Sequence, residues 1–561
     1  MLRTSCTFTL TLLFGCLTPA FAQSPAERLL APRQAYDTVR VPMPDGVQLV
    51  TDVFVPAKSG PFPTIFLVTP YGTTQHRELA EAWSKAGYAV VLQNQRGKGG
   101  SDGEFQPFIH ETQDHSVSLE WILAQDWCDG RIGLLGTSSQ SYSAQLLAAT
   151  EHPAIKTLVN VSGLTDVEEL FFPGGAFRLD TMYPWLFFNV LNRPIRKDSL
   201  WQERFERLPL ESGFEWDSAV FEAMWNASVD TSKIRIPTMH LTGWNDVVYR
   251  QSLILRAGIE KASSGEAFQK LIVGPWMHNQ IRSDQTSAGD EEFGPSALMD
   301  EARYAALVQR WFDRFLKGEE NGLSEEPPVD LFVMGANEWI HREQWPPEDS
   351  SPVRFFLAAG ESDGRLQTEP GEGPEASEFT FDPANPVSTM GGVNSHIFPH
   401  KAGPMDQSSF EKRSDVLVLT TEPFEAPATL AGPLRAELYV TSSAKDTDFT
   451  VKLMAVKKDG YARILEDGIR RVSTRESRTE PKLLTPGEVV RLDIDLGATA
   501  YRIDRGERLR IHVSSSNFPK YDRNPNTGEP AFSAETLEIA RQKVLHSKAR
   551  PSFVEVWMLE G

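Results

Sequence analysis

The stretch IGLLGTSSQSYSAQLL occupies residues 132–147 and carries the clearest structural signal in the chain. Its first four residues form an apolar run that predicts a buried strand, and residues 140–147 have a helix-like composition. Ser138 stands between the two, so a sharp turn from strand to helix would lift its hydroxyl out of the sheet edge. Gly136, two residues earlier, allows the backbone to cross closely at this turn. The stretch therefore predicts a strained, exposed serine that is suited to act as a nucleophile.

A nucleophilic serine needs a base to take its proton and an acid to orient that base. In α/β-hydrolases, which use such a strand–serine–helix turn, the acid and then the histidine follow the serine along the chain. Asp246 ends the strand-like residues 237–245, and His278 follows the apolar run at residues 271–277. Alone, Asp246 could cap a helix and His278 could be structural, but together with Ser138 they stand at strand ends in the required order. We therefore predict a serine hydrolase in which Ser138, His278 and Asp246 form the catalytic triad.

Such a hydrolase also needs hydrogen-bond donors for the oxyanion of the tetrahedral intermediate. One donor is expected to be the backbone N–H of Ser139, the residue after the nucleophile. Tyr71 ends the strand-like residues 68–71 at the same sheet edge, so its phenol could supply the second hydrogen bond. The alternative interpretation of Tyr71 is a packed aromatic ring at the end of a strand.

Short apolar runs alternate with helix-like segments between about residues 39 and 161. Three of the runs are continuous enough to be strands buried on both faces: residues 64–68, 89–92 and 157–161. This pattern is typical of a mostly parallel sheet that is covered by helices. The pattern stops near residue 165 and resumes at residue 236, so we predict an α/β-hydrolase domain built from residues 23–165 and 232–350.

An insertion at residues 166–231 interrupts this domain between the nucleophile and the acid, where α/β-hydrolases carry a cap over the active site. The insertion is rich in aromatic residues, namely Phe171, Phe172, Phe177, Tyr183, Trp185, Phe187, Phe188, Trp201 and Trp225. Most of these rings are expected to form the core of a small helical cap, because aromatic residues dominate cores generally. We predict that Phe171 and Phe172 line the substrate pocket, together with Trp244 and Trp276 of the sheet domain.

After residue 352 the chain consists of short strand-like runs that are separated by Gly, Pro, Asp and Asn. Residues 436–440 and 509–513 are examples, and helix signals are sparse apart from about residues 534–545. This texture predicts an all-β sandwich or jelly roll, which we place at residues 351–561.

Residues 1–22 have the features of a secretion signal. Arg3 supplies a basic start, residues 8–17 are mostly apolar, and Ala20-Phe21-Ala22 precede a cleavage point at Gln23. The apolar stretch is shorter than a membrane span requires, which disfavours an uncleaved anchor. We therefore expect an exported protein, periplasmic or extracellular, with no membrane span. Removal of the signal would leave Cys128 as the single cysteine, so no internal disulfide is expected.

The net charge and the motifs of the chain argue against nucleic-acid partners, nucleotide cofactors and metals. The 561 residues carry a net charge of −20, so the chain lacks the basic balance that nucleic-acid binding requires. The glycines at residues 96–103 match neither the dinucleotide fingerprint nor a phosphate-binding loop, and we expect them to shape the rim of the active site. The histidines do not cluster with acids at metal-ligand spacing, so we predict neither a metal nor another cofactor. The oligomeric state stays open.

Further motifs run almost from one end of the chain to the other. They are Thr69-Pro70-Tyr71, Arg96-Gly97 with the following residues 101–105, Trp127–Gly133, Gly243–Asp246, Gly274–His278 and the long stretch at residues 514–528. In these motifs the chain resembles the family that includes cocaine esterase, α-amino acid ester hydrolases, glutaryl-cephalosporin acylases and X-Pro dipeptidyl-peptidases. The resemblance implies an α/β-hydrolase with a helical cap and a C-terminal jelly roll, with Ser138, Asp246 and His278 as the triad and Tyr71 as oxyanion donor.

The chain departs from this family's pattern at positions that bear on specificity. Ser139 and Ser141 stand where the family usually has Tyr and Gly, and Val247-Val248-Tyr249 stand where the amino-ester hydrolases place carboxylates that hold the substrate ammonium. Three cap acids could substitute for those carboxylates: Asp166, Glu168 and Glu169. Ester, amide and X-Pro peptide substrates all stay open, and the missing acid pair favours an esterase or acylase over a dipeptidyl-peptidase. A hypothesis of another class is a non-catalytic binding protein on a hydrolase scaffold.

Overall fold

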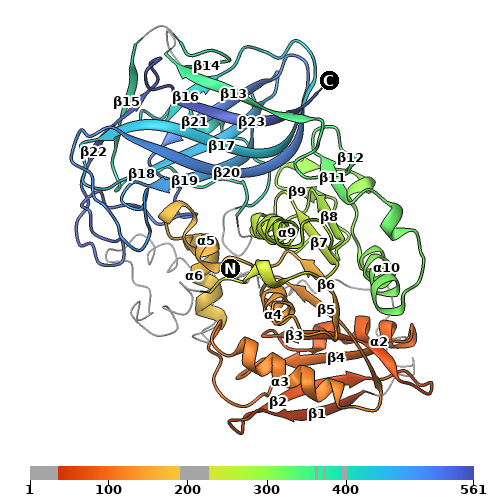
Figure 1. Ribbon diagram of the computed structural model, residues 1–561. Coiled ribbons are helices and arrows are strands. Elements are labelled where there is room, and N and C mark those ends of the chain that lie inside the picture. Colours follow the sequence, from red (N-terminus) through yellow and green to blue (C-terminus); the bar gives the residue numbers. More distant parts are fainter. Residues whose placement is uncertain (1–35, 190–226, 360–363, 372–373, 395–400, 561) are drawn as a thin grey trace, which may run out of the picture. The chain divides into compact units, whose positions relative to one another are not determined.

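The computed structural model describes residues 36–189, 227–359, 364–371, 374–394 and 401–560 (Figure 1). The predicted signal at residues 1–22 lies outside this range, as do Trp201 and Trp225 of the predicted cap. Cleavage before Gln23 therefore stays a prediction.

The first part of the chain builds a 10-stranded sheet in the order β1-β2-β4-β3-β5-β6-β7-β8-β11-β12. Its strands are β1 (Asp37–Pro42), β2 (Gln48–Phe54), β3 (Phe62–Thr69), β4 (Ala89–Asn94), β5 (Cys128–Thr137), β6 (Ile155–Val161), β7 (Thr238–Gly243), β8 (Gln269–Gly274), β11 (Val329–Val333) and β12 (Glu338–Arg342). The strands from β4 to β11 pair in parallel, and antiparallel strands flank them at both edges. Every residue of β3, β4, β7 and β8 is buried, as expected for a parallel sheet that helices cover on both faces.

Helices cover the sheet through two separate apolar clusters. The helices are α2 (Arg77–Lys85), α3 (Glu111–Leu123), α4 (Ser139–Ala148), α9 (Tyr249–Ser263) and α10 (Glu301–Phe312), the last of which continues into a π-helical turn at Asp313–Lys317. Apolar residues of α3, α4 and α9 join one cluster, and those of α2 and α10 join the other. This arrangement is the α/β-hydrolase domain that the sequence predicted.

The described part of the insertion is helical. It contains α5 (Val167–Phe171), a 3-10 turn at Pro173–Gly175 and α6 (Leu179–Asn189), and a β-bridge joins Asp166 to Ser228 where the insertion begins and ends. Phe171, Met182 and Tyr183 are buried in the cluster that also holds α3, α4 and α9. The cap therefore packs on the face of the sheet domain on which α4 lies.

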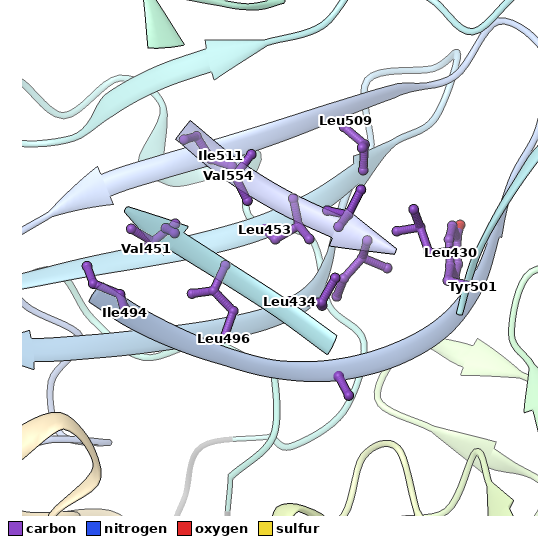
Figure 2. Close-up of a cluster of buried hydrophobic side chains, with 14 of the residues drawn as sticks. Leu430, Leu434, Val451, Leu453, Ile494, Leu496, Tyr501, Leu509, Ile511 and Val554 are labelled. Carbon is purple, nitrogen blue, oxygen red and sulfur yellow. The ribbon is translucent and has the colours of Figure 1, made fainter. Parts of the chain in front are cut away.

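The C-terminal part of the chain forms an all-β domain with an 11-stranded sheet. Its strands are β13 (Ser350–Ala358), β14 (Gly364–Gln367), β15 (Ala376–Phe381), β16 (Leu417–Thr420), β17 (Ala428–Ser442), β18 (Asp448–Val456), β19 (Ala462–Arg471), β20 (Val490–Ile503), β21 (Arg508–Ser514), β22 (Ala540–Leu545) and β23 (Phe553–Leu559). Figure 2 shows its core, into which aliphatic side chains of β17, β18, β20, β21 and β23 converge. The predicted jelly-roll domain is therefore present.

The helix-like pattern at residues 534–545 is a wrong prediction. Residues Ala540–Leu545 form β22, which pairs antiparallel with β15 and β17. Ala540, Gln542 and Val544 are buried, whereas Arg541 and Lys543 are exposed, so the side chains alternate with the period of a strand. Long polar side chains on the exposed face gave this segment its helix-like composition.

Several contacts between the two domains involve the cap and α9. Tyr249 at the start of α9 exchanges hydrogen bonds with the backbone N–H and C=O of Ala498 in β20, at 2.7 and 3.0 Å. The backbone of Phe177 in the cap bonds Asp522 of the β domain through both its N–H and its C=O. The β domain thus contacts both the cap and α9, the helix that follows Asp246. None of the helices in the described part of the chain combines the length and the apolar run that crossing a bilayer requires.

Candidate active site

The turn between β5 and α4 holds Ser138 in a strained conformation. Its φ of 58° and ψ of −127° lie in a region that few non-glycine residues adopt. Gly136 makes the turn feasible, because a Cβ there would lie 2.3 Å from the Cα of Ser141. The N–H of Ser138 donates to Val161 O of the adjacent strand at 3.0 Å. The backbone therefore fixes the position of the serine hydroxyl before any substrate binds.

Ser138, His278 and Asp246 form a continuous hydrogen-bonded chain. His278 Nε2 lies 3.1 Å from Ser138 Oγ, and His278 Nδ1 lies 2.9 Å from Asp246 Oδ1. Ser138 follows β5, Asp246 follows β7 and His278 follows β8, so three parallel strands deliver the residues to one edge of the sheet. The structure thus brings together Ser138, Asp246 and His278, the three residues whose order along the chain predicted a triad.

The carboxylate of Asp246 is fully buried and has a fixed orientation. Its Oδ1 accepts a hydrogen bond from the backbone N–H of Val248 at 2.9 Å as well as facing His278 Nδ1. A carboxylate at this position requires Nδ1 to carry a hydrogen, which leaves the Nε2 lone pair directed at Ser138. The arrangement therefore selects the tautomer that can accept the serine proton.

The electrostatic environment raises the pKa of His278 above its ordinary value of 6.5. Burial of the ring acts to lower the pKa, but the negative charge of Asp246 and its hydrogen bond to the ring act more strongly in the opposite direction. The ring consequently holds a proton more firmly than a free imidazole does, as a proton acceptor paired with a carboxylate should.

Two candidate oxyanion donors lie beside the serine. Ser139 is the first residue of α4, and the first N–H groups of a helix have no partner within the helix. The Tyr71 hydroxyl lies 2.7 Å from Ser139 Oγ and accepts a hydrogen bond from Trp185 Nε1 at 3.1 Å. Tyr71 is 41% exposed, and the burial of the rest of its side chain raises the pKa of the phenol, whereas hydrogen bonds with Ser139, Trp185 and Ser138 act to lower it, so the phenol keeps its hydrogen at neutral pH. The Tyr71 hydroxyl therefore lies next to the side chains of Ser138 and Ser139.

An apolar pocket opens directly at Ser138 and His278. The other residues that line it are Leu164, Leu170, Phe171, Thr181, Met182, Trp185, Val247 and Val248. They come from the cap, from the segment after β6 and from the residues directly after Asp246. Phe171 lines the pocket as predicted, and so do Val247 and Val248, which stand where the amino-ester hydrolases place carboxylates. Sequence analysis assigned no such role to Leu164, Leu170, Thr181 or Met182, and it indicated Trp185 only as one of the cap rings.

The prediction of the other pocket residues is wrong, because Trp244 and Trp276 lie in the core. The Nε1 of Trp244 donates to Phe332 O at 2.9 Å, and the Nε1 of Trp276 donates to Ala297 O at 2.6 Å. Both rings are almost completely buried, and burial of an indole requires such an acceptor. Phe172 also turns away from the pocket and packs on Phe177, with ring centroids 5.3 Å apart.

The three cap acids that sequence analysis considered as ammonium ligands do not line this pocket. Asp166 caps the N-terminus of α5 by accepting a hydrogen bond from the N–H of Glu169. Glu168 and Glu169 face Arg478 of the β domain at 3.0 and 3.6 Å. Asp166 therefore stabilises a helix within the cap, and Glu168 and Glu169 tie the cap to the β domain. The described lining of the pocket contains no carboxylate.

The glycine-rich segment at residues 96–103 lies against the cap. Lys98 Nζ donates to the carbonyl of Asn189 at the end of α6, at 2.7 Å. Arg96 binds Asp114 with two nitrogens, at 2.9 and 2.7 Å.

Within the described residues, no group of three or more His, Cys, Asp or Glu side chains is arranged to hold a metal ion.

Comparison with protein families identifies relatives over both domains. A family described as X-Pro dipeptidyl-peptidase (S15 family) matches residues 45–280. A second family, described as the X-Pro dipeptidyl-peptidase C-terminal non-catalytic domain, matches residues 321–555. The chain is also 32% identical over 546 residues to the cocaine esterase of Rhodococcus sp., covering 87% of this chain and 92% of that protein.

Solved structures share the fold at lower identity. An aminopeptidase from a marine sediment Thaumarchaeota archaeon superimposes with a TM-score of 0.80 at 24% identity, covering 94% of this chain and 97% of that one. An α-amino acid ester hydrolase superimposes with a TM-score of 0.75 at 23% identity, covering 98% of this chain and 100% of that one. These two structures support the architecture of an α/β-hydrolase domain followed by an all-β domain.

Proposed function

The chain belongs to the serine hydrolase family that includes cocaine esterase and the S15 X-Pro dipeptidyl-peptidases, and from this premise we propose that it hydrolyses esters of apolar carboxylic acids. The observation that carries the proposal is the hydrogen-bonded chain of Ser138, His278 and Asp246 at one end of an apolar pocket. The family comprises both esterases and dipeptidyl-peptidases. We favour an esterase because the described pocket is apolar and offers no carboxylate to a substrate ammonium group.

In the proposed mechanism, Ser138 Oγ attacks the carbonyl carbon of the substrate while its proton passes to His278 Nε2. Asp246 stabilises the imidazolium that results. The tetrahedral intermediate collapses when the bond to the leaving alcohol breaks and His278 returns the proton to that oxygen. Water then attacks the acyl-enzyme in the same way, giving up a proton to His278, and the acid is released as Ser138 regains its hydrogen.

Negative charge develops on the carbonyl oxygen in both tetrahedral intermediates. In the proposal, the backbone N–H of Ser139 and the hydroxyl of Tyr71 stabilise this charge. Donors that are held in place before reaction cost little reorganisation when the charge appears.

The pH profile follows from the raised pKa of His278. His278 accepts a proton only as the neutral imidazole, so kcat/KM should fall as the pH drops through the pKa of this ring. Because that pKa is raised, we expect the midpoint of the acid limb to lie above 6.5. Steady-state kinetics with a neutral ester from about pH 5 to pH 9 measures the midpoint. A midpoint at or below the ordinary imidazole value would contradict the role of Asp246.

The pocket lining predicts which acyl groups the enzyme accepts. An ammonium group in the substrate would have to leave water without a described carboxylate to pair with, and Val247 and Val248 offer it no Coulombic partner. We therefore expect phenylacetic acid methyl ester to be hydrolysed at least as efficiently as phenylglycine methyl ester, which differs by its α-amino group. The ratio of kcat/KM for the two esters measures the discrimination.

A preference of about tenfold or more for the amino ester, equal to about 1.4 kcal/mol of transition-state free energy, would contradict this specificity. An Ala-Pro anilide serves as the peptidase control in the same assay. Efficient cleavage of that anilide, with little cleavage of either ester, would favour an X-Pro dipeptidyl-peptidase instead.

The proposal also includes export, with the mature enzyme beginning at Gln23 and acting in the periplasm or outside the cell.

A further inference from the structure

The hydroxyl of Tyr71 neighbours the nucleophile Ser138 and two further side chains that no catalytic role yet explains. Trp185 Nε1 of the cap donates to Tyr71 Oη at 3.1 Å, and Ser139 Oγ lies 2.7 Å from the same atom. A phenol oxygen has one hydrogen to donate and two lone pairs with which to accept. The direction of the Tyr71 hydrogen therefore depends on what these neighbours do.

Trp185 can act only as a donor, because an indole nitrogen has no lone pair available for hydrogen bonding. Its ring is held by two phenylalanines. Phe108 stacks on it with centroids 5.9 Å apart, and Phe171 meets it edge-on at 6.5 Å. The indole N–H thus occupies one lone pair of Tyr71 Oη in a fixed direction.

Ser139 has a hydroxyl whose hydrogen can rotate, and its side chain is buried at the N-terminus of α4. If this hydroxyl donates to Tyr71, both lone pairs of the phenol are filled and the Tyr71 hydrogen must point in the remaining direction. Building on the function proposed above, we propose that Ser139 and Trp185 are positioning residues that jointly direct the Tyr71 O–H toward the substrate oxygen. Both would act on the oxyanion only through Tyr71.

Two donors on the phenol oxygen also polarise its O–H bond, because successive hydrogen bonds strengthen one another. The opposite arrangement, in which Tyr71 donates to Ser139, would tie up the catalytic hydrogen in the resting enzyme. The two arrangements predict opposite effects when the Ser139 hydroxyl is removed.

A double-mutant cycle in the full-length enzyme tests the proposal. Tyr71→Phe should lower kcat about a hundredfold, as expected for the loss of one oxyanion donor. Ser139→Ala and Trp185→Phe should each lower kcat about fivefold, the size expected for one hydrogen bond, with little change in KM for Ser139→Ala. In the Tyr71→Phe background, the same two substitutions should have no further effect on kcat, because the hydroxyl on which they act is gone.

Two further variants serve as controls. Ser139→Thr retains a hydroxyl and should recover most of the kcat that Ser139→Ala loses. Ser143→Ala removes another buried hydroxyl from α4, one that accepts from Gln95 rather than facing Tyr71, and should leave kcat unchanged. Circular dichroism and the thermal midpoint of each variant show whether it has folded.

Several results would overturn the proposal. They are an unchanged or increased kcat in Ser139→Ala, an unchanged kcat in Trp185→Phe, or losses of equal size with and without the Tyr71 hydroxyl. Activity that persists in Ser138→Ala would instead overturn the proposed function, so the two failures can be told apart.

Discussion

Replacement of Ser138 by alanine should abolish turnover and leave the fold intact. The substitution removes one hydroxyl, and alanine can adopt the same backbone angles at about the same steric cost because both residues carry a Cβ. No described hydroxyl besides that of Ser138 is hydrogen-bonded to His278 Nε2. Loss of a triad nucleophile lowers kcat by several orders of magnitude, and we expect less than about a thousandth of the wild-type rate.

The measurement is kcat for a phenylacetic ester, with the thermal midpoint of both proteins as the control for folding. An inactive variant that melts at the wild-type temperature supports the assignment of Ser138. A residual rate above about a thousandth of wild type would show that another group performs the attack.

Replacement of Asp246 by asparagine should have the second largest effect, a loss of about ten thousandfold in kcat. The amide has nearly the shape of the carboxylate, so the buried site stays filled. The atom that faces His278 Nδ1 also accepts from the N–H of Val248. An asparagine that turns its NH₂ group toward Nδ1 loses the Val248 hydrogen bond and favours the tautomer with hydrogen on Nε2, which cannot accept the Ser138 proton. An asparagine that keeps its oxygen there leaves the imidazolium without a counter-charge. The substitution also removes the negative charge that raises the pKa of His278, while burial continues to lower it.

Both consequences can be measured on the same variant. Besides the lower kcat, the acid limb of the residual activity should move to lower pH relative to the wild type. A loss of less than about tenfold, or an acid limb at the wild-type position, would contradict the proposed part that Asp246 plays.

The catalytic constellation could be predicted from the sequence because a parallel sheet converts chain order into position. The carboxyl ends of β5, β7 and β8 meet at one edge, so residues just after those strands must lie close together. Ser138, Asp246 and His278 each follow an apolar run that predicts a strand. Their proximity in the fold could therefore be predicted from their order along the chain, whatever the number of residues between them.

The pocket could be predicted only in part, because proximity in sequence to a catalytic residue does not give the direction of a side chain. Trp244 and Trp276 stand two residues before Asp246 and His278, yet their indole N–H groups bond backbone carbonyls of Phe332 and Ala297 in the core. Those acceptors belong to distant segments that the local pattern does not reveal.

Two other features depended on long-range contacts. The segment Ala540–Leu545 is a strand because β15 and β17 supply its hydrogen-bonding partners. Glu168 and Glu169 were considered as ligands for a substrate ammonium, but Arg478 of the β domain pairs with both. In each case a residue far along the chain determines the local role.

Labelling with a fluorophosphonate shows which serine is the nucleophile, because the reagent reacts with a serine only when a neighbouring base activates it. The account predicts a single adduct on Ser138 in the peptide spectrum of the labelled enzyme, and no labelling of the Ser138→Ala or His278→Ala variants. An adduct on Ser139 or Ser141, or labelling that persists in Ser138→Ala, would contradict it.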